Sequence, residues 1–109
     1  MASIHITDAE SVLLEVLWRH GPLAPARLMA EVKTMRPWGG ATIKTLLGRL
    51  MQKKAVRSQR DDGLLRYHAL IERPAYVESQ VRALIDRLFG GDAHAMSAFL
   101  AGRIVTSGE

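Results

Sequence analysis

The chain has 109 residues, of which 48% are hydrophobic and 24% charged, a balance typical of one small globular domain or of one domain with a short appendage. It contains no cysteine, which excludes disulfides, thiolate metal sites and cysteine nucleophiles. No apolar run approaches the roughly 18 residues of a membrane helix, and no basic-then-apolar leader is present. We therefore expect a cytoplasmic protein with no membrane partner.

The positive charge is concentrated in one part of the sequence. Residues 32–60 contain eight Lys or Arg side chains and no Asp or Glu, so this segment carries +8. Because the net charge is +4, the rest of the chain sums to −4. Segregation on this scale favours a binding surface for a polyanion, although a solvated basic face would look the same from charge alone.

Two short helices are predicted first. Thr7 and Glu10 have the spacing of a capping box, which places a helix start directly after Thr7. This helix should end near His20-Gly21-Pro22. A second helix is predicted from about Pro25, a residue suited to a first turn, to about Thr34.

A third helix is predicted over roughly Ala41–Lys54, after a turn that contains Pro37. Apolar residues recur at i, i+3, i+4, i+7 and i+8, which indicates one buried face. They are Ile43, Leu46, Leu47, Leu50 and Met51. The opposite face is polar and basic, with Thr42, Lys44, Thr45, Arg49, Gln52 and Lys53.

A β-hairpin is predicted next. A short segment from Val56 and a second one over Leu64–Leu70 flank the polar stretch Arg60-Asp61-Asp62-Gly63, and Asp-Gly between two strands is a hairpin signal. Three helices followed by a hairpin is the element order of a winged helix-turn-helix. The predicted fold class is therefore mainly α with a small β-hairpin wing, and residues 1–72 form the predicted DNA-binding domain.

Residues 73–109 are predicted to form a helical dimerisation arm. Pro74 opens a fourth helix that ends at Phe89-Gly90-Gly91, and a fifth helix follows a possible cap at Asp92. Their apolar residues are Val77, Val81, Leu84, Ile85, Leu88, Phe89, Met96, Phe99, Leu100 and Ile104. A three-helix domain has no room to bury these stripes, so we expect a homodimer.

The third helix supplies the candidates for reading DNA bases, because its polar face carries side chains that reach base edges in a major groove. These candidates are Thr42, Lys44, Thr45 and Arg49. The candidates for phosphate contacts are Lys33, Arg36, Lys53, Lys54, Arg57 and Arg60. The alternative for each lysine is a surface side chain that contributes only to solubility. The alternative for Thr42 is a residue that starts the helix. Arg66 lies either along the DNA or across the hairpin from Asp61 or Asp62.

Other functions have weaker support in the sequence. The four histidines lie far apart, so we predict no metal site and no cofactor. No Ser-His-Asp set or Gly-rich phosphate loop is present, so we predict no enzymatic activity. Trp18, Trp38 and Tyr67 are predicted to be core residues, with base stacking as the alternative. The alternative to a DNA-binding protein is a winged-helix interaction module whose basic face binds an acidic protein.

The order of motifs resembles one known family, the penicillinase and methicillin-resistance repressors. The matching segments are Ile6–Glu10, Val16–Trp18, Gly21–Leu23, Trp38, Thr42–Leu47, Arg49-Leu50, Lys53-Lys54, Tyr76-Val77 and Asp86–Gly91. The resemblance implies a repressor that binds a palindromic double-stranded operator as a homodimer and controls an antibiotic-resistance operon of the β-lactam type or a related one. It also implies a sensor-linked protease as a partner, with Ala98-Phe99 as the best match to the sensitive region. The copper-responsive branch carries a cysteine cluster, which this chain lacks.

Overall fold

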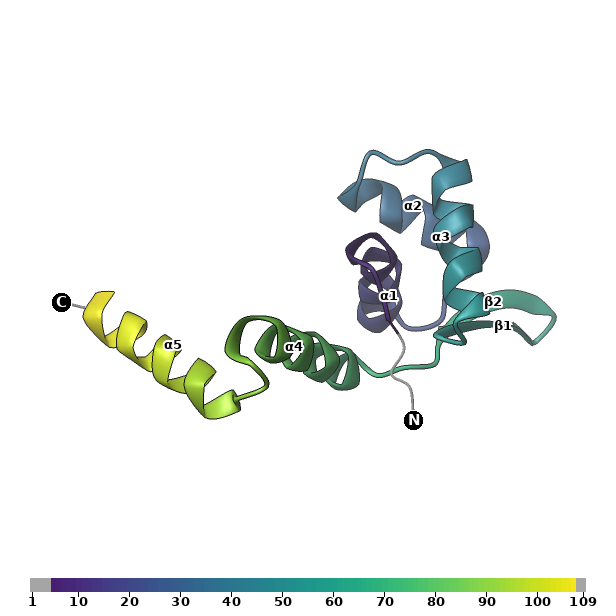
Figure 1. The fold of residues 1–109 in the computed structure, drawn as a ribbon. Coiled ribbons are helices and arrows are strands. Elements are labelled where there is room, and N and C mark those ends of the chain that lie inside the picture. The colour runs from purple at the N-terminus through teal and green to yellow at the C-terminus, as the bar shows by residue number, and fades with distance from the viewer. Residues whose placement is uncertain (1–4, 108–109) are drawn as a thin grey trace. The chain divides into compact units, whose positions relative to one another are not determined.

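The computed structural model describes the backbone of residues 5–107 and the side chains of residues 5–103. In chain order the elements are α1 (Asp8–His20), α2 (Pro25–Met35), α3 (Gly40–Gln52), β1 (Val56–Asp61), β2 (Leu64–Ala69), α4 (Arg73–Phe89) and α5 (Ala93–Ser107) (Figure 1). They form two compact units, Met1–Arg73 and Pro74–Glu109. The first unit has three helices and a hairpin, which confirms the predicted fold class.

The start of α1 is fixed by its first four residues. The Thr7 hydroxyl accepts the backbone N–H of Glu10 at 3.1 Å, and the Glu10 carboxylate accepts the backbone N–H of Thr7 at 3.0 Å. Both halves of the predicted capping box are therefore formed. The helix ends before Gly21, whose φ of 80° lies in the region that favours glycine.

The core of the first unit lies between the three helices and the base of the hairpin. Its buried apolar residues are Ile6, Val12, Leu13, Leu14, Val16, Leu17, Leu23, Leu28, Val32, Ile43, Leu46, Leu47, Leu50, Ala55 and Val56. The side chain of Met51, predicted to join them, is instead 37% exposed. At about 100° per residue, Met51 lies about 80° around α3 from Ile43, at the edge of the apolar stripe. The helix packs its central stripe and leaves that edge to solvent.

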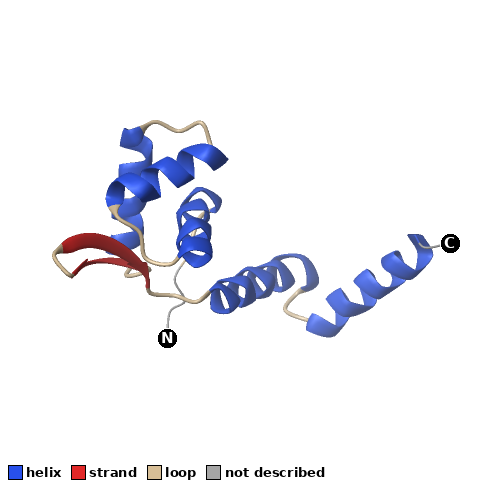
Figure 2. Cartoon of the chain, turned by 180° about the vertical axis from the view of Figure 1, so that it is seen from behind, coloured by secondary structure: helices blue, strands red, loops and turns tan. Residues whose placement is uncertain are grey.

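The hairpin projects beyond the helices of the first unit (Figure 2). Its strands pair antiparallel from Val56 opposite Ala69 to Asp61 opposite Leu64. Asp62 and Gly63 both have positive φ, 55° and 82°, as a two-residue type I′ turn requires. The predicted Asp-Gly hairpin is confirmed.

One further pairing anchors the hairpin to the helices. Leu23, between α1 and α2, forms an isolated antiparallel bridge with Tyr67 of β2. The backbone N–H of Tyr67 donates to the Leu23 carbonyl at 2.8 Å, and the Leu23 N–H donates back at 3.3 Å. A single-residue bridge has no periodicity, so the sequence did not predict it.

The second unit consists of α4 and α5. Gly90 and Gly91, both at positive φ, separate the helices, and the Asp92 carboxylate accepts the backbone N–H of Ala95 at 3.2 Å as the predicted cap. The rings of Phe89 and Phe99 pack with their centroids 5.8 Å apart. No helix in the described part of the chain is long and apolar enough to cross a membrane.

Candidate nucleic-acid interface

The outer face of α3 carries the four residues that the sequence predicts to contact bases. The side chains of Thr42, Lys44, Thr45 and Arg49 are all exposed. A shallow groove of about 320 Å³ runs along this face, lined by Ala41, Thr42, Thr45, Leu46 and Arg49. The groove combines methyl groups, hydroxyls and one guanidinium, which are the groups that contact thymine methyls and guanine edges.

Thr45 has one of its hydrogen-bonding functions already occupied. Its hydroxyl donates to the backbone carbonyl of Ala41, one turn earlier, at 3.0 Å. The proton is therefore directed into the helix, while the oxygen lone pairs and the methyl group remain available. Thr45 can accept a hydrogen bond or pack against a methyl group, but it is a poor donor in this rotamer.

Most of the predicted phosphate contacts are exposed cations. Lys33, Arg36, Lys54, Arg57 and Arg60 lie on the surface, and none of them forms an ion pair with a described side chain. Among the described residues, Arg36 donates to the backbone carbonyl of Met35 and Arg60 to that of Gly63. No described side chain therefore neutralises the charge of these five cations.

Lys53 is placed differently from this expectation. Its ammonium lies 2.6 Å from the Glu10 carboxylate and 2.7 Å from the backbone carbonyl of His5. Glu10 is 1% exposed, whereas the Lys53 side chain is 30% exposed. The lysine expected to meet a phosphate thus forms an internal ion pair between the end of α3 and the start of α1.

The pKa of Glu10 reflects this ion pair. Burial by itself would raise the pKa of the carboxyl, but the hydrogen bonds from Lys53 and Thr7 and the charge of Lys53 together lower it. The net direction is below the ordinary value, so Glu10 is ionised at neutral pH. The pair therefore carries two opposite charges.

The wing has one strongly polar face. By the strand register, Arg57, Gln59 and Asp61 of β1 share a face with His68 and Arg66 of β2. His68 lies 2.8 Å from the Asp61 carboxylate, and this hydrogen bond, with a second from Gln59, holds the pKa of Asp61 below its usual range.

Arg66 therefore does not have Asp61 as a close partner. It is exposed and forms no ion pair with the described side chains, although its charge is close enough to help lower the pKa of Asp61. Arg60 lies on the other face of the hairpin, opposite Leu65. The three wing arginines are accordingly divided between two faces, with Arg57 and Arg66 together.

The three aromatic residues predicted to belong to the core are partly buried. Trp18, Trp38 and Tyr67 are all of intermediate exposure. The indole N–H of Trp18 donates to the carbonyl of Ile71 at 2.9 Å, and Tyr67 lies in the bridge to Leu23. These contacts favour a packing role for Trp18 and Tyr67.

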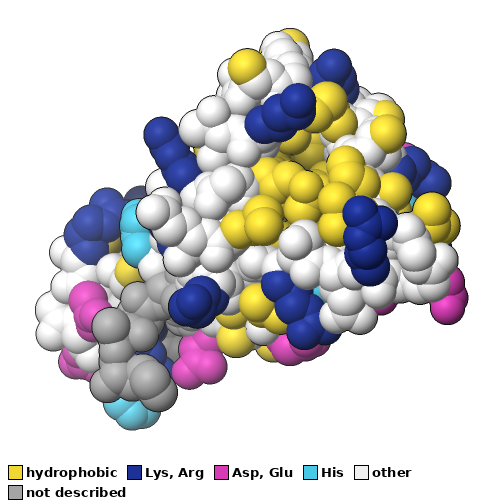
Figure 3. All heavy atoms as spheres, turned by 90° about the vertical axis from the view of Figure 1, so that its right-hand side faces the viewer, with side chains coloured by type: hydrophobic (Ala, Val, Ile, Leu, Met, Phe, Trp, Pro, Cys, Tyr) yellow, Lys and Arg dark blue, Asp and Glu magenta, His cyan; other side chains and the backbone are white. Residues whose placement is uncertain are grey.

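The basic side chains surround an apolar area on one face of the molecule. Figure 3 shows several Lys and Arg side chains spread over one face around a hydrophobic area, with Asp and Glu nearer its margins. A surface of this kind can attract phosphate at several points and contact apolar groups between them.

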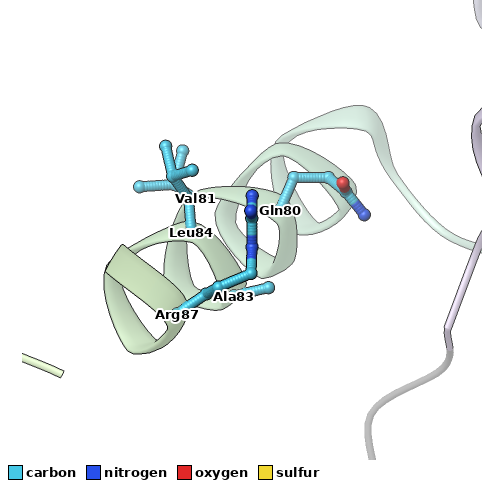
Figure 4. Close-up of a pocket in the computed structure, with 5 residues that line it drawn as sticks. All are labelled: Gln80, Val81, Ala83, Leu84 and Arg87. Atoms are coloured by element: carbon cyan, nitrogen blue, oxygen red, sulfur yellow. The ribbon is translucent and has the colours of Figure 1, made fainter. Parts of the chain in front are cut away.

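The second unit exposes an apolar row. Val77, Val81, Leu84 and Leu88 recur at i, i+4, i+7 and i+11 along α4, and each is at least 36% exposed. A shallow groove of about 460 Å³ lies at the middle of this row, lined by Gln80, Val81, Ala83, Leu84 and Arg87 (Figure 4).

The other predicted dimerisation residues differ in exposure. Ile85 is buried, Phe89 and Met96 are of intermediate exposure, and Phe99 and Leu100 are exposed. The side chain of Ile104 lies outside the described ones.

The sequence is similar to penicillinase repressors and to methicillin resistance regulatory proteins. The family model of the penicillinase repressor matches residues 6–109. The penicillinase repressor of Bacillus licheniformis is 26% identical over 91 residues, which cover 84% of this chain and 71% of that protein. The methicillin resistance regulatory protein MecI of Mammaliicoccus sciuri is 22% identical over 91 residues, covering 84% and 74%.

Two solved structures resemble the chain. The solution structure of Bacillus licheniformis BlaI in its monomeric form, in complex with the blaP half-operator, matches with a TM-score of 0.62 and 28% identity, covering 70% of this chain and 94% of that one. The DNA-binding domain of the repressor BlaI matches with a TM-score of 0.58 and 28% identity, covering 67% and 90%. The family model confirms the expectation of a repressor rather than an enzyme. The chain belongs to the penicillinase repressor family.

Proposed function

We propose that this protein represses transcription by binding an operator through the outer face of α3. The observation that carries the proposal is the composition of that face. Exposed Thr and Arg side chains line a groove, Lys44 is exposed on the same helix, and no acidic residue occurs in the helix. The likeness to a repressor structure in complex with a half-operator supports it. In this arrangement α3 enters the major groove of the DNA.

Side chains of α3 would contact bases, and the cations around them would contact phosphates. Arg49 and Lys44 would donate to guanine, and Thr42 and Thr45 would place methyl groups against thymine. Exposed cations around them, Lys33, Arg36, Lys54, Arg57 and Arg60, would contact phosphates and fix the position of the helix. Of the wing arginines, Arg66 would join Arg57 and Arg60 in these contacts.

A binding experiment with two duplexes tests this function. One duplex is selected by the protein from a randomised pool, and the other is a random duplex of the same length. The protein should prefer the selected duplex, and the affinity should fall steeply with salt. If no duplex is enriched and random DNA shows no salt-dependent binding, the alternative of an acidic protein partner takes its place.

Arg49→Ala separates base contacts from phosphate contacts. Loss of a bidentate contact should cost about 1–3 kcal/mol of discrimination, because the selected duplex loses a partner that random DNA does not offer. Thr45→Ala should act in the same direction but more weakly. An Arg49→Ala protein with unchanged preference would refute the placement of this face in the groove.

We infer that the repressor acts as a homodimer on a palindromic operator. The exposed row of α4 has the spacing of a seam that packs against a second helix, and a second copy of the chain offers the same row. A two-fold protein dimer matches a two-fold operator. Selected duplexes should accordingly contain inverted repeats. Single half-sites would contradict the dimer on DNA.

Family membership supports a further proposal about the regulated operon and the relief of repression. We propose control of a β-lactam-resistance operon or a related one, with relief by a sensor-linked protease that cleaves in α5 at Ala98-Phe99. Phe99 is 52% exposed, and its ring centroid lies 5.8 Å from that of Phe89 and 5.6 Å from the Arg103 guanidinium. In the native host, Phe99→Ala should abolish induction. A fully inducible variant would refute this site.

A further inference from the structure

The lysine pair at the end of α3 contains two side chains with different surroundings. Lys54 is exposed and forms no ion pair with a described side chain. Lys53 has its ammonium on the buried carboxylate of Glu10 and on the carbonyl of His5. Adjacent residues of the same type thus offer a direct comparison of a free cation with an engaged one.

The Glu10 carboxylate joins three parts of the chain. One oxygen, Oε1, accepts both the backbone N–H of Thr7 and the ammonium of Lys53. The same ammonium reaches the backbone of His5, which precedes the α1 cap. The end of α3 is therefore held against the start of α1 by charged hydrogen bonds on a buried acceptor, which are stronger and more directional than a surface ion pair.

We propose that the Glu10–Lys53 pair is a positioning device for operator recognition, which sets the direction of α3 through its C-terminal end. This rests on the proposed function, since it concerns how the recognition face of α3 meets DNA. Arg49 lies one turn before Lys53 on the same helix, and its backbone carbonyl accepts the Lys53 N–H at 2.9 Å. A rotation or shift of the helix end would therefore displace Arg49 from a base edge.

This role differs from a phosphate contact in what it predicts. A lysine that contacts phosphate binds all sequences alike, and its removal lowers the slope of log K against log salt by about 0.9. A lysine that orients the helix affects the selected duplex more than the random one and leaves the slope nearly unchanged. The pair of measurements distinguishes the two roles without knowledge of the natural operator.

The experiment compares Lys53→Met with the control Lys54→Met. Both substitutions remove one charge and keep a long unbranched side chain. The affinities for the selected duplex and for the random duplex are measured at a series of salt concentrations. Lys53→Met should reduce the preference for the selected duplex at least fivefold with the slope within about 0.3 of the wild type. Lys54→Met should lower the slope by about 0.9 and keep the preference.

A second variant covers the case in which Lys53→Met does not fold. Glu10→Gln with Lys53→Met leaves no unpaired buried carboxylate, and its fold is checked by circular dichroism before binding is measured. Preference within twofold of the wild type, in whichever of these variants folds, would overturn the proposal. Absence of any preference in the wild type would instead refute the proposed function.

Discussion

Lys54→Gly should make the protein more stable although it removes a surface side chain. Lys54 follows the end of α3 with φ at +63°, in the left-handed region. Its N–H donates to the Met51 carbonyl at 3.0 Å, and the N–H of Ala55 donates to the Leu50 carbonyl at 2.9 Å. These two bonds form a Schellman motif, in which glycine usually occupies the left-handed position.

The magnitude follows from two opposing terms. A left-handed conformation costs an L-residue about 1–2 kcal/mol, which glycine does not lose. Glycine also lowers the free energy of unfolding by about 0.5–1 kcal/mol, because it loses more backbone freedom on folding. The net gain in the free energy of unfolding should be about 0.5–1 kcal/mol. For a domain of this size, that corresponds to an increase in Tm of about 2–8 °C.

Thermal and urea unfolding of two control variants isolates the cause. Lys54→Ala removes the same charge but keeps the left-handed strain, so its stability should stay within about 0.5 kcal/mol of the wild type. Gln52→Gly places glycine in the last turn of α3, where it should destabilise by about 0.5–1 kcal/mol. Lys54→Gly and Lys54→Ala should weaken binding to random DNA equally, because each loses one cation.

The result that refutes this reasoning is a Lys54→Gly protein no more stable than Lys54→Ala. That outcome would mean that position 54 bears no conformational strain in the folded protein. Binding to random DNA tests the charge of Lys54 independently of this strain. Unequal weakening of random-duplex binding by the two variants would show that Lys54 contributes more than its charge.

Three further changes test other parts of the structure. The pKa of Glu10 is lowered in the folded state, so the ionised carboxylate stabilises the folded protein fully above about pH 4.5. This contribution to the free energy of unfolding is lost as the pH falls through the pKa of the folded state. Glu10→Gln should therefore flatten the acid limb of a stability–pH curve. An unchanged limb contradicts the ion pair. Leu50→Ala in the core should cost about 2–5 kcal/mol in urea unfolding, and Met51→Ala, at an exposed position, less than half of that. Leu84→Asp should give a monomer in light scattering at tens of micromolar, whereas Arg82→Gln should remain dimeric; a dimeric Leu84→Asp protein would exclude the α4 row from the interface.

Most features of α3 are determined by residues close together in the sequence. Its apolar stripe, its exposed basic face and the hairpin that follows could be predicted because each is set by residues close in the chain. The capping box of Thr7 and Glu10 is also set by residues close in the chain. The Asp62-Gly63 turn depends on backbone freedom at two adjacent residues. Local spacing and local backbone chemistry determined all of these elements.

The partner of Lys53 could not be predicted in this way. At about 100° per residue, Lys53 lies about 80° from Ile43, on the edge of the apolar stripe opposite to Met51, a position that does not by itself distinguish a free lysine from a paired one. Only the packing of α1 against α3 decides between them, because it brings Glu10 within 2.6 Å of a residue 43 positions away. The bridge from Leu23 to Tyr67 has the same origin. The sequence by itself determined the helices, the wing and the charged face, whereas the tertiary structure decided which charges remain free, since a buried carboxylate neutralises the nearest cation that the fold places beside it.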